Sequence, residues 1–456
     1  MLGDPGVLWF PGDSYLYLGA ALRPRPDLSK TVGYSFLLRV LDPLHSFVLV
    51  ALLQHLMGLA IAVMMYVLAR RARLPRWGAT LCCLPVLLDG YEIQLEHMLM
   101  SETLFTSLIM IAVTIALWRD SQAGMHAAGG AVAGLLTGCA VIVREAGIPL
   151  IVVLTGYFLV RWRGWLLPVA VAAGCLAPVA AYAAWFHSVN GQYTLNRATG
   201  FYLWGRTTSF ADCAVIRPPT AERRLCVWQP VADRAPPGRF VWTSPAAREL
   251  PGGPVTAASN KLLTDFAVRA ITAQPFGYLH SVVRGVRVAV SWQRLTYPGP
   301  VTVADYLFPH RPQVPPANRT WIPGGTAAQD ARAYGHTSAT PVVRPFSAMI
   351  RVYQRYFYTR GPLFGAILAI GLGGLIRSWR RLAGPGLLPW AVAITLLLFP
   401  IATIDFDYRY LLPVLPFACL AAMLAFAPAE DAHGRLLSWR QKLLLRARRT
   451  GSGGTS

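Results

Sequence analysis

The chain has 456 residues, of which 54% are hydrophobic and only 14% are charged, and its mean hydropathy is +0.43. A soluble protein carries about a quarter charged residues, so the composition predicts a polytopic membrane protein. The formal net charge of +21 does not indicate nucleic-acid binding, because no basic helix with interleaved aromatic residues is present. Only three of the 42 basic residues are lysines, which favours coding from a GC-rich genome such as that of an actinobacterium.

Apolar runs along the chain predict its division into segments. A membrane-spanning helix needs about 20 mostly apolar residues. Nine runs are candidates, several of them short: roughly 45–69, 78–92, 100–118, 127–143, 146–160, 164–186, 361–376, 385–403 and 409–427. The sequence therefore predicts an all-α polytopic bundle with a first loop (1–44), six spans (45–186), a large irregular loop region (187–360), three spans (361–427) and a basic tail (428–456).

The distribution of basic residues in short loops predicts the orientation of such a bundle. One set of connections, with the tail, carries Arg70, Arg71, Arg73, Arg76, Arg119, Arg161, Arg163, Arg377, Arg380, Arg381, Arg435, Arg440, Lys442, Arg446, Arg448 and Arg449. The alternate short connections, near 93–99, 144–145 and 404–408, carry only Arg144 besides the Arg409 that follows them. We therefore expect the first set in the cytoplasm, and residues 1–44 and 187–360 outside the plasma membrane.

Nine spans and a cytoplasmic C-terminus place the N-terminus outside. The opening "MLGDPGVLWF" has neither the basic region nor the long apolar region of a signal peptide. Either this N-terminus crosses the membrane unaided, or the natural protein carries one further helix upstream. The second interpretation is favoured and gives ten spans.

The long outer segment has two parts. Within 187–300, the run "YLHSVVRGVRVAVSW" (278–292) is basic and amphipathic, which predicts an interfacial helix rather than a span. Residues 298–345 are rich in Pro, Gly and Ala and predict an irregular loop. Cys213 and Cys226 face an oxidising space, where a disulfide is expected; the alternative is two free thiols.

Two acidic residues are expected on the same side of the membrane. Asp13 follows Pro11 and Gly12 ahead of the first apolar run, and Glu102 opens the third run from the same face. An ionisable residue at the mouth of a span is a functional hypothesis by default. There is a plainer interpretation for each residue. Asp13 would be a turn or capping residue before a short interfacial helix, and Glu102 would be an acid that the dipole of its helix favours in the first turn.

Three stretches of sequence together resemble the GT-C superfamily of polyprenyl-phosphate-dependent glycosyltransferases. They are the acidic first loop followed by "SKTVGY", the entry "MLMSETLF", and the late motif "DFDYRYLLPVLPFACLAAMLAF" (405–426). Their order, and the large outer loop before the final spans, are similar to bacterial protein mannosyltransferases and aminoarabinose transferases. Those enzymes begin with a transmembrane helix ahead of the first acidic loop, and this chain departs from that pattern.

The resemblance implies an inverting transfer of a sugar from a polyprenyl-phosphate donor to an acceptor hydroxyl outside the membrane. Asp13 would be the general base and Glu102 the second acid. Lys30, which precedes Gly33 and Tyr34, would bind the donor phosphate; otherwise it is an interfacial lysine. The other candidates for phosphate binding are Arg409, Arg206 and Arg144; Arg144 could instead pair with Glu145. The residues expected to contact the sugar or the acceptor are Tyr15, Tyr34 and Tyr408.

This chemistry requires no metal or other cofactor. The histidines lack the spacing of metal ligands, although a divalent ion that bridges an acid and the phosphate is an open alternative. The expected partners are the lipid-linked donor, membrane lipids and a cell-envelope glycan, lipid or protein acceptor. Two other classes of protein are open alternatives: a non-catalytic membrane scaffold, and a transporter or flippase of lipid-linked sugars. A transporter would favour ionisable residues at the middle of the membrane and internal sequence repeats. The sequence names neither the sugar nor the acceptor.

Overall fold

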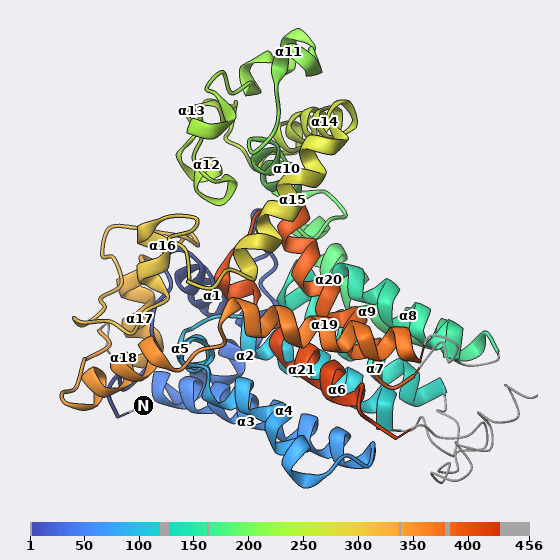
Figure 1. The fold of residues 1–456 in the computed structure, drawn as a ribbon. Helices are drawn as coiled ribbons and strands as arrows, with labels where there is room; N and C mark the ends of the chain where they lie inside the picture. Colours follow the sequence, from blue (N-terminus) through green and yellow to red (C-terminus); the bar gives the residue numbers. More distant parts are fainter. Residues whose placement is uncertain (1, 119–126, 162–163, 337–338, 379–383, 429–456) are drawn as a thin grey trace, which may run out of the picture.

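The protein folds as a bundle of helices (Figure 1). The computed structural model describes residues 2–118, 127–161, 164–336, 339–378 and 384–428. Within these residues every regular element is a helix, apart from two isolated bridges, Leu8 with Met98 and Gln313 with Thr340. The predicted all-α class is confirmed. Arg119, Arg163, Arg380 and Arg381, and the tail beyond residue 428, lie outside the described residues.

Each predicted span is found as a helix: α3 (Phe47–Arg71), α4 (Arg76–Leu88), α6 (Glu102–Trp118), α7 (Ala127–Val143), α8 (Ile148–Arg161), α9 (Leu166–Asn190), α19 (Gly361–Arg377), α20 (Leu387–Thr403) and α21 (Leu415–Leu424). Within the described residues, α3 and α9 are the helices long and apolar enough to cross a membrane alone. Helix α18 (Phe346–Tyr356) and α19, bent by 56°, would make a third span. A helical membrane protein is supported, and the number of nine spans stays a prediction.

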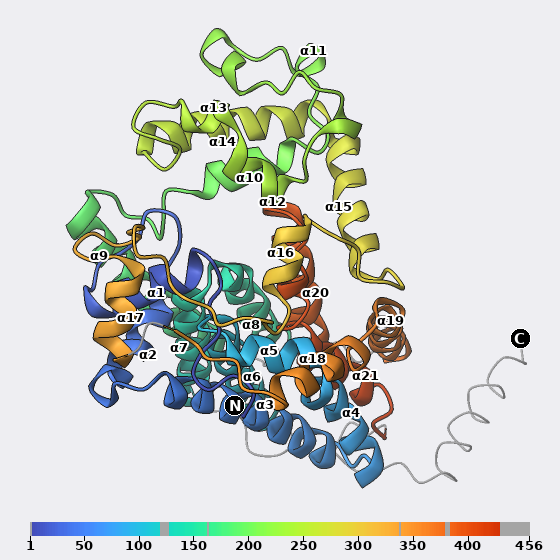
Figure 2. The same ribbon diagram turned by 90° about the vertical axis from the view of Figure 1, so that its left-hand side faces the viewer.

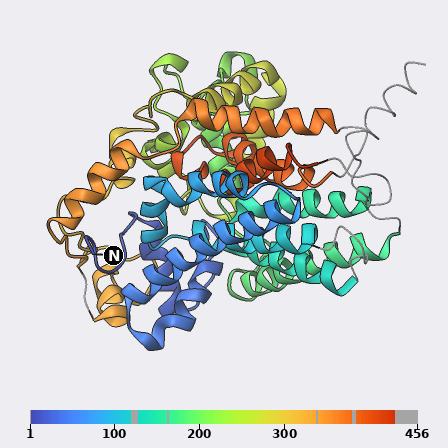
Figure 3. The same cartoon turned by 60° about the horizontal axis from the view of Figure 1, so that its bottom comes forward.

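Small residues let two helices of the bundle pack at close range. Gly130, Gly134 and Gly138 recur every fourth residue on one face of α7. A Cβ atom on Gly134 would lie 2.2 Å from the carbonyl oxygen of Val171 in α9, and one on Gly138 would lie 2.2 Å from that of Cys175. Such spacing is typical of membrane helices that bring their backbones together. In Figure 3 the orange and red C-terminal helices run alongside the blue and teal helices of the N-terminal half.

Short elements at one end of the bundle carry the residues discussed below. They are α1 (Asp13–Leu22), α2 (Gly33–Leu41), η1 (Asp42–Leu44), α5 (Gly90–His97), η2 (Glu145–Gly147) and η5 (Tyr408–Tyr410). Helix α1 is buried from Ser14 to Ala21, and packs against α2 and α17 (Ala327–Gly335). The stretch predicted as a short interfacial helix is therefore a covered part of the fold.

The segment 187–360 is more ordered than the predicted irregular loop. It contains α10 (Thr199–Thr207), α11 (Cys213–Ile216), η3 (Thr220–Leu225), η4 (Val231–Asp233), α12 (Pro237–Thr243), α13 (Pro245–Arg248), α14 (Ala257–Ala273), α15 (Pro275–Ala289), α16 (Pro300–Asp305), α17 and α18. Residues 198–270 enclose a hydrophobic core of their own, which includes Trp204, Phe201, Leu263 and Phe266. We call the part from α10 to α14 the outer lobe; it stands at one end of the molecule above α20 (Figure 2).

The predicted interfacial run 278–292 overlaps α15, which leads from the outer lobe back along α20 (Figure 2). The prediction of an irregular loop over 298–345 is wrong for α16 and α17. Helix α17 starts with a capping box, in which Thr326 accepts from the backbone N–H of Gln329 and the Gln329 side chain accepts from that of Thr326. The Pro and Gly residues near this helix gave the stretch the composition of a loop, so the sequence did not predict the helix.

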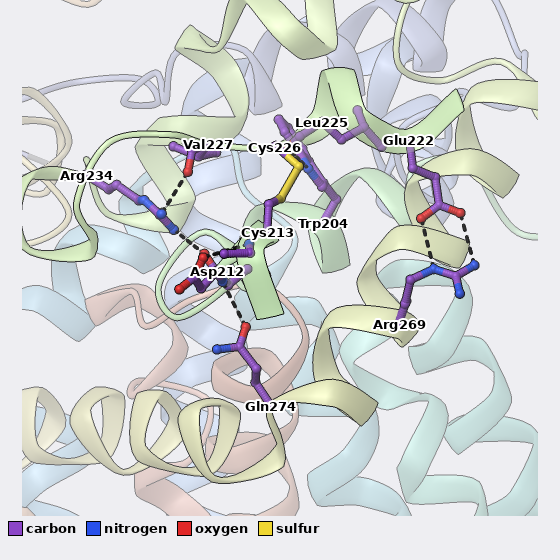
Figure 4. Close-up of a disulfide and its surroundings, with 12 residues drawn as sticks. Trp204, Asp212, Cys213, Glu222, Leu225, Cys226, Val227, Arg234, Arg269 and Gln274 are labelled. Atoms are coloured by element: carbon purple, nitrogen blue, oxygen red, sulfur yellow. Dashed lines mark hydrogen bonds and ion pairs between the residues drawn. A yellow bond between two sulfur atoms is a disulfide. The ribbon is translucent and has the colours of Figure 1, made fainter. Parts of the chain in front are cut away.

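A disulfide between Cys213 and Cys226 closes a loop at the edge of the outer lobe (Figure 4). Beside it the indole N–H of Trp204 donates to the carbonyl oxygen of Leu225 at 3.2 Å. Arg234 donates to backbone carbonyl groups on both sides of this loop, those of Ala211 and Val227 at 2.8 Å each. The loop is therefore fixed by one covalent bond, by a hydrogen bond from the buried Trp204, and by the bonds of Arg234 to its flanking residues.

We expect replacement of both Cys213 and Cys226 by Ala to destabilise the outer lobe by about 3 kcal/mol, because the bond removes loop-closure entropy from the unfolded chain. Thermal unfolding in detergent and limited proteolysis would measure the effect, with cleavage gained between residues 198 and 270. Cys139→Ala, which removes a free half-buried thiol of α7, is the matched control. Equal melting temperatures and cleavage patterns in all three proteins would contradict the expectation.

Candidate active site

Asp13 lies at the start of α1, where the chain turns sharply. Gly12 before it has a φ of 89°, a backbone conformation that glycine adopts without steric cost. The turn points the Asp13 carboxylate at two cations from distant parts of the chain. Its Oδ1 accepts from Lys30 Nζ, and its Oδ2 accepts from Arg409 Nη1 at 2.7 Å.

The two cations determine the charge state of this carboxylate. Burial alone would raise the pKa of Asp13, but the charges of Lys30 and Arg409 and their hydrogen bonds hold that pKa well below its usual range. Burial alone would lower the pKa of the Lys30 ammonium, and the Asp13 charge raises it instead. Asp13 is therefore an ionised carboxylate in this state, paired on both oxygens.

Glu102 is the second acid of the cluster. It begins α6, is only 1% exposed, and forms an ion pair with Arg144 at the end of α7. Its Oε1 also lies 3.8 Å from Arg409 Nη1. Arg409 therefore bridges Glu102 and Asp13. Arg144 pairs with Glu102 rather than with its sequence neighbour Glu145, the alternative partner expected from the sequence.

Aromatic rings and a third acid hold Arg409 in place. Its guanidinium carbon lies 5.0 Å from the ring centre of Phe10 and 5.3 Å from that of Tyr410. Asp407, two residues earlier in the chain, places Oδ2 3.6 Å from Arg409 Nε. That same Oδ2 accepts from the hydroxyl of Tyr306 at 2.9 Å. These contacts fix the planar guanidinium with one edge toward Asp13 and Glu102.

The loop that carries Lys30 is held by a further buried acid. Glu145 accepts from the backbone N–H of Thr31 at 3.1 Å and from the side-chain amide of Asn196. Burial raises the pKa of Glu145 to about 7, against the lowering effect of these hydrogen bonds and of Lys30. The Asn196 side chain in turn accepts from the backbone N–H groups of Ala198 and Thr199 at the start of α10. Glu145 thereby links the Lys30 loop to the outer lobe.

Five of the sequence-predicted residues are brought together: Asp13, Glu102, Lys30, Arg144 and Arg409. Tyr15 packs against Trp9 and Trp321, with ring centres 5.6 and 4.8 Å away. Tyr34 is fully buried and donates to Gln54 of α3 at 2.6 Å.

Arg206 and Tyr408 contact other groups. Arg206 is 2% exposed, donates to Ser281 at 2.9 Å and lies 3.7 Å from Asp405. Tyr408 accepts from the backbone N–H of Leu295 at 2.6 Å. Neither is in contact with Asp13 among the described residues, so a role in binding the donor at this cluster stays a prediction for both.

Sequence reasoning missed Asp407, Tyr306 and the part played by Glu145. Asp407 stands two residues before Arg409 in the quoted motif "DFDYRY", so this spacing was the available indication. Tyr306 follows α16 in a stretch that the composition marks as irregular, and nothing local predicts its contact with Asp407. Glu145 lies next to Arg144 in sequence, and only the arrangement of helices shows that the two side chains have different partners.

The groups of this cluster that could bind a metal ion are its three carboxylates, Asp13, Glu102 and Asp407. Each of them faces a cation or a hydroxyl donor. No group of three or more His, Cys, Asp or Glu side chains arranged to hold a metal ion occurs within the described parts of the chain. The cluster of Asp13, Lys30, Glu102, Arg144, Asp407 and Arg409, hereafter the charged cluster, holds three acids and three cations.

A buried charged cluster at the end of a helical membrane bundle is the class of site that these side chains define. No family model matches the sequence, and no curated protein matches it. Among solved structures, the chains that are similar include an archaeal oligosaccharyltransferase and the protein ArnT, at low sequence identity.

Two of these structures illustrate the likeness. The first is the archaeal oligosaccharyltransferase AglB from Archaeoglobus fulgidus, in complex with an inhibitory peptide and a dolichol-phosphate. It is 12% identical with a TM-score of 0.38, and the match covers 99% of this chain and 49% of that one, so this chain spans about half its length. The second is ArnT from Cupriavidus metallidurans in the apo state, 14% identical with a TM-score of 0.34, where 92% of this chain and 73% of that one are covered.

We expect Glu145→Gln to flatten the pH dependence of stability. The folded pKa of Glu145 is raised to about 7 from an unfolded value of 4.5, so the stability that it contributes is present below pH 4.5 and is lost as the pH rises through 7. The melting temperature in detergent should therefore fall between pH 5 and pH 8 in the wild type and fall less in the variant. Glu249→Gln, at an exposed position of the outer lobe, is the control and should keep the wild-type slope; an identical slope in Glu145→Gln would refute the assignment.

Proposed function

We propose that the protein is an inverting glycosyltransferase that moves a sugar from a polyprenyl-phosphate donor to an acceptor hydroxyl at the extracytoplasmic face of the plasma membrane. The observation that supports this most is the pairing of Asp13 with both Lys30 and Arg409. A base for a hydroxyl group and two cations for a phosphate stand within hydrogen-bond distance of one another.

The reaction requires one proton transfer and one exchange of C–O bonds. The acceptor oxygen attacks the anomeric carbon of the donor sugar on the face opposite the phosphate, and its proton passes to a carboxylate oxygen of Asp13. The bond between the anomeric carbon and the phosphate oxygen breaks. Polyprenyl phosphate leaves with the electron pair, and the anomeric configuration is inverted. Lys30 and Arg409 neutralise the charge that develops on the leaving phosphate.

In this proposal, the ion pairs of the charged cluster make Asp13 an effective base only once a donor is bound. While Lys30 and Arg409 both bind Asp13, its pKa is too low for it to accept a proton readily. A donor phosphate competes for the same N–H groups, because charge-assisted hydrogen bonds to phosphate are strong. As these cations turn to the phosphate, the pKa of Asp13 rises toward its ordinary value, and the carboxylate becomes a better base.

Glu102 and Arg144 form the opposite side of the cluster. Glu102 contacts Arg409 at 3.8 Å, so it restrains the cation that Asp13 shares with the phosphate. In this proposal Glu102 also accepts a hydrogen bond from the acceptor and directs its hydroxyl toward Asp13. Arg144 pairs with Glu102 and prevents it from taking Arg409 away from the donor.

The alternatives are a membrane scaffold and a carrier of lipid-linked sugars. A carrier would favour ionisable side chains near the middle of its spans. The charged cluster instead lies where helices begin or end: Asp13 opens α1, Glu102 opens α6, and Arg409 stands in η5 before α21. This placement favours surface chemistry on a lipid-anchored substrate. A scaffold would retain the fold without requiring an ionised Asp13.

We expect Asp13→Asn to lower the transfer rate by about 10²- to 10⁴-fold, because it removes the general base. Membranes containing the protein would receive radiolabelled polyprenyl-phosphate mannose, arabinofuranose or galactose, and transfer of label to a water-soluble or lipid-free product would be measured. Asp27→Asn is the matched control, because within the described residues Asp27 accepts from Ser29 of its own loop and not from the charged cluster. Transfer unchanged in Asp13→Asn would reject the assigned base; no transfer from any donor by the folded wild type would favour the scaffold or carrier.

We expect Lys30→Gln and Arg409→Gln each to lower kcat/KM for the donor by about 10²- to 10³-fold, the usual effect of removing one group that stabilises an oxyanion. Lys261→Gln is the control, since Lys261 pairs with Asp265 on the exposed face of α14. Removing one partner of a buried ion pair also destabilises the fold. The melting temperature of each variant is therefore measured beside its kinetics, and wild-type kcat/KM in a folded Arg409→Gln would contradict the phosphate role.

A further inference from the structure

The start of the outer lobe lies directly against the loop that carries Lys30. The backbone N–H of Arg197 donates to the carbonyl oxygen of Leu28 in that loop at 2.7 Å. Glu145 joins the same loop to Asn196, because each of its two carboxylate oxygens accepts from one of them. Helix α10 begins three residues after Asn196. Its first turn is therefore fixed next to the Lys30 loop.

A second set of contacts ties the outer lobe to the segment that carries Arg409. The backbone N–H of Gly238 in α12 donates to Asp405 Oδ2 at 2.8 Å, and α12 lies next to the end of α20 (Figure 2). Arg206 of α10 lies 3.7 Å from Asp405 Oδ1, and both side chains are buried. Since Asp405 precedes η5 by three residues, the outer lobe is fixed relative to both cations that bind Asp13.

Tyr202 stands in the first turn of α10 and is held by neighbouring aromatic rings. Its ring centre lies 5.6 Å from that of Phe201 and 6.2 Å from that of Trp242 on α12. The side chain is half-buried, and its hydroxyl group forms no hydrogen bond within the described chain and keeps contact with solvent. Packing thus fixes the ring and leaves the hydroxyl group available to a ligand.

The hydroxyl group of Tyr202 faces the charged cluster. Burial raises the pKa of Tyr202; among the charges that act on it, that of Lys30 is the strongest and lowers the pKa, and that of Asp13 is the next and raises it. The pKa of Lys30 responds in turn: burial lowers it, and the charges of Asp13 and then of Tyr202 raise it. Tyr202 therefore presents a neutral phenol beside Lys30, which can both donate and accept a hydrogen bond.

This position suits the sugar of the donor. One oxygen atom joins the sugar ring to the phosphate, so a phosphate on Lys30 and Arg409 brings the ring close to both cations. The polyprenyl chain stays in the bilayer, and the sugar points toward the side where the outer lobe is expected. Sugar hydroxyl groups are neutral and pair well with a phenol, whereas the phosphate oxygens form stronger hydrogen bonds with the cations.

We propose that Tyr202 recognises the donor sugar, and that its hydroxyl group forms a hydrogen bond with a hydroxyl group of the sugar whose phosphate lies on Lys30. The inference rests on the proposed function and goes further, because it assigns the choice of sugar to the outer lobe. The ligand of Tyr202 is the carbohydrate, and neither the phosphate nor the lipid chain. Tyr15, Tyr34 and Tyr408, the contacts expected from the sequence, bond or pack elsewhere.

Binding is tested on the full chain in detergent, without acceptor, by isothermal titration with farnesyl phosphate and with its esters of mannose, arabinofuranose and galactose. Tyr202→Phe removes one oxygen atom and keeps the ring between Phe201 and Trp242. We expect it to weaken the ester that the wild type binds most tightly by roughly 3- to 10-fold, the effect of one lost hydrogen bond, and to leave farnesyl phosphate unchanged. Lys30→Gln should weaken both ligands.

Tyr193→Phe is the matched control, because Tyr193 is 75% exposed and stacks on His187; it should bind every ligand as the wild type does. The melting temperature of each variant shows whether it is folded. Equal weakening of farnesyl phosphate and of the ester would place the hydroxyl group on the phosphate and overturn the proposal.

Unchanged affinity for every ester in folded Tyr202→Phe would overturn the sugar contact alone, while loss of transfer in Asp13→Asn would still uphold the proposed function. A folded wild type that transfers sugar from no donor would overturn the proposed function, and the sugar contact with it.

Discussion

The ion pair between Asp13 and Arg409 is the constraint on which the arrangement of the cluster depends. It joins residues near the two ends of the described chain, 396 positions apart in sequence. A buried charge is costly unless it is paired and hydrogen-bonded, so Asp13, Lys30 and Arg409 stabilise the fold only when all three are in place. Since α1, the loop before α2, α6, α7 and η5 each supply a charge, no one of these elements can shift without leaving an uncompensated charge in the interior.

The same balance limits what can bind. Asp13, Glu102 and Asp407 offset Lys30, Arg144 and Arg409, so the charged cluster is close to neutral with its acids ionised. An anion that enters must take hydrogen bonds from a cation that now serves an acid. A phosphate can do so because it offers several oxygens, and the acid that it releases becomes more basic as a result. In the proposed function, substrate binding and activation of the base are then one electrostatic event.

The sequence predicted the helices of the bundle and part of the cluster for identifiable reasons. Long apolar runs mark helices such as α3 and α9 without knowledge of the tertiary structure. Asp13 and Glu102 were identified because charges are rare at the edges of apolar runs, and Lys30 and Arg409 because the motifs around them resemble those of a known superfamily. The partner of Arg144 could not be predicted, because the choice between Glu102 and the adjacent Glu145 is made by helix packing. The outer lobe was missed because its short helices lack apolar runs, and its core is assembled from residues spread over 198–270.

The three-residue turn η5 places adjacent residues in different surroundings. Side chains in a 3₁₀ turn advance by about 120° per residue, so neighbours point in different directions. Arg409 faces Asp13 and the charged cluster, while Tyr408 lies under the guanidinium of Arg294 and lines a cavity next to α19. The Tyr408 hydroxyl also accepts from the backbone N–H of Leu295 and fixes the segment that carries Arg294. Because Tyr408 is bonded to the segment at Leu295 and Arg409 is bonded to Asp13, η5 joins two distant parts of the chain through adjacent residues.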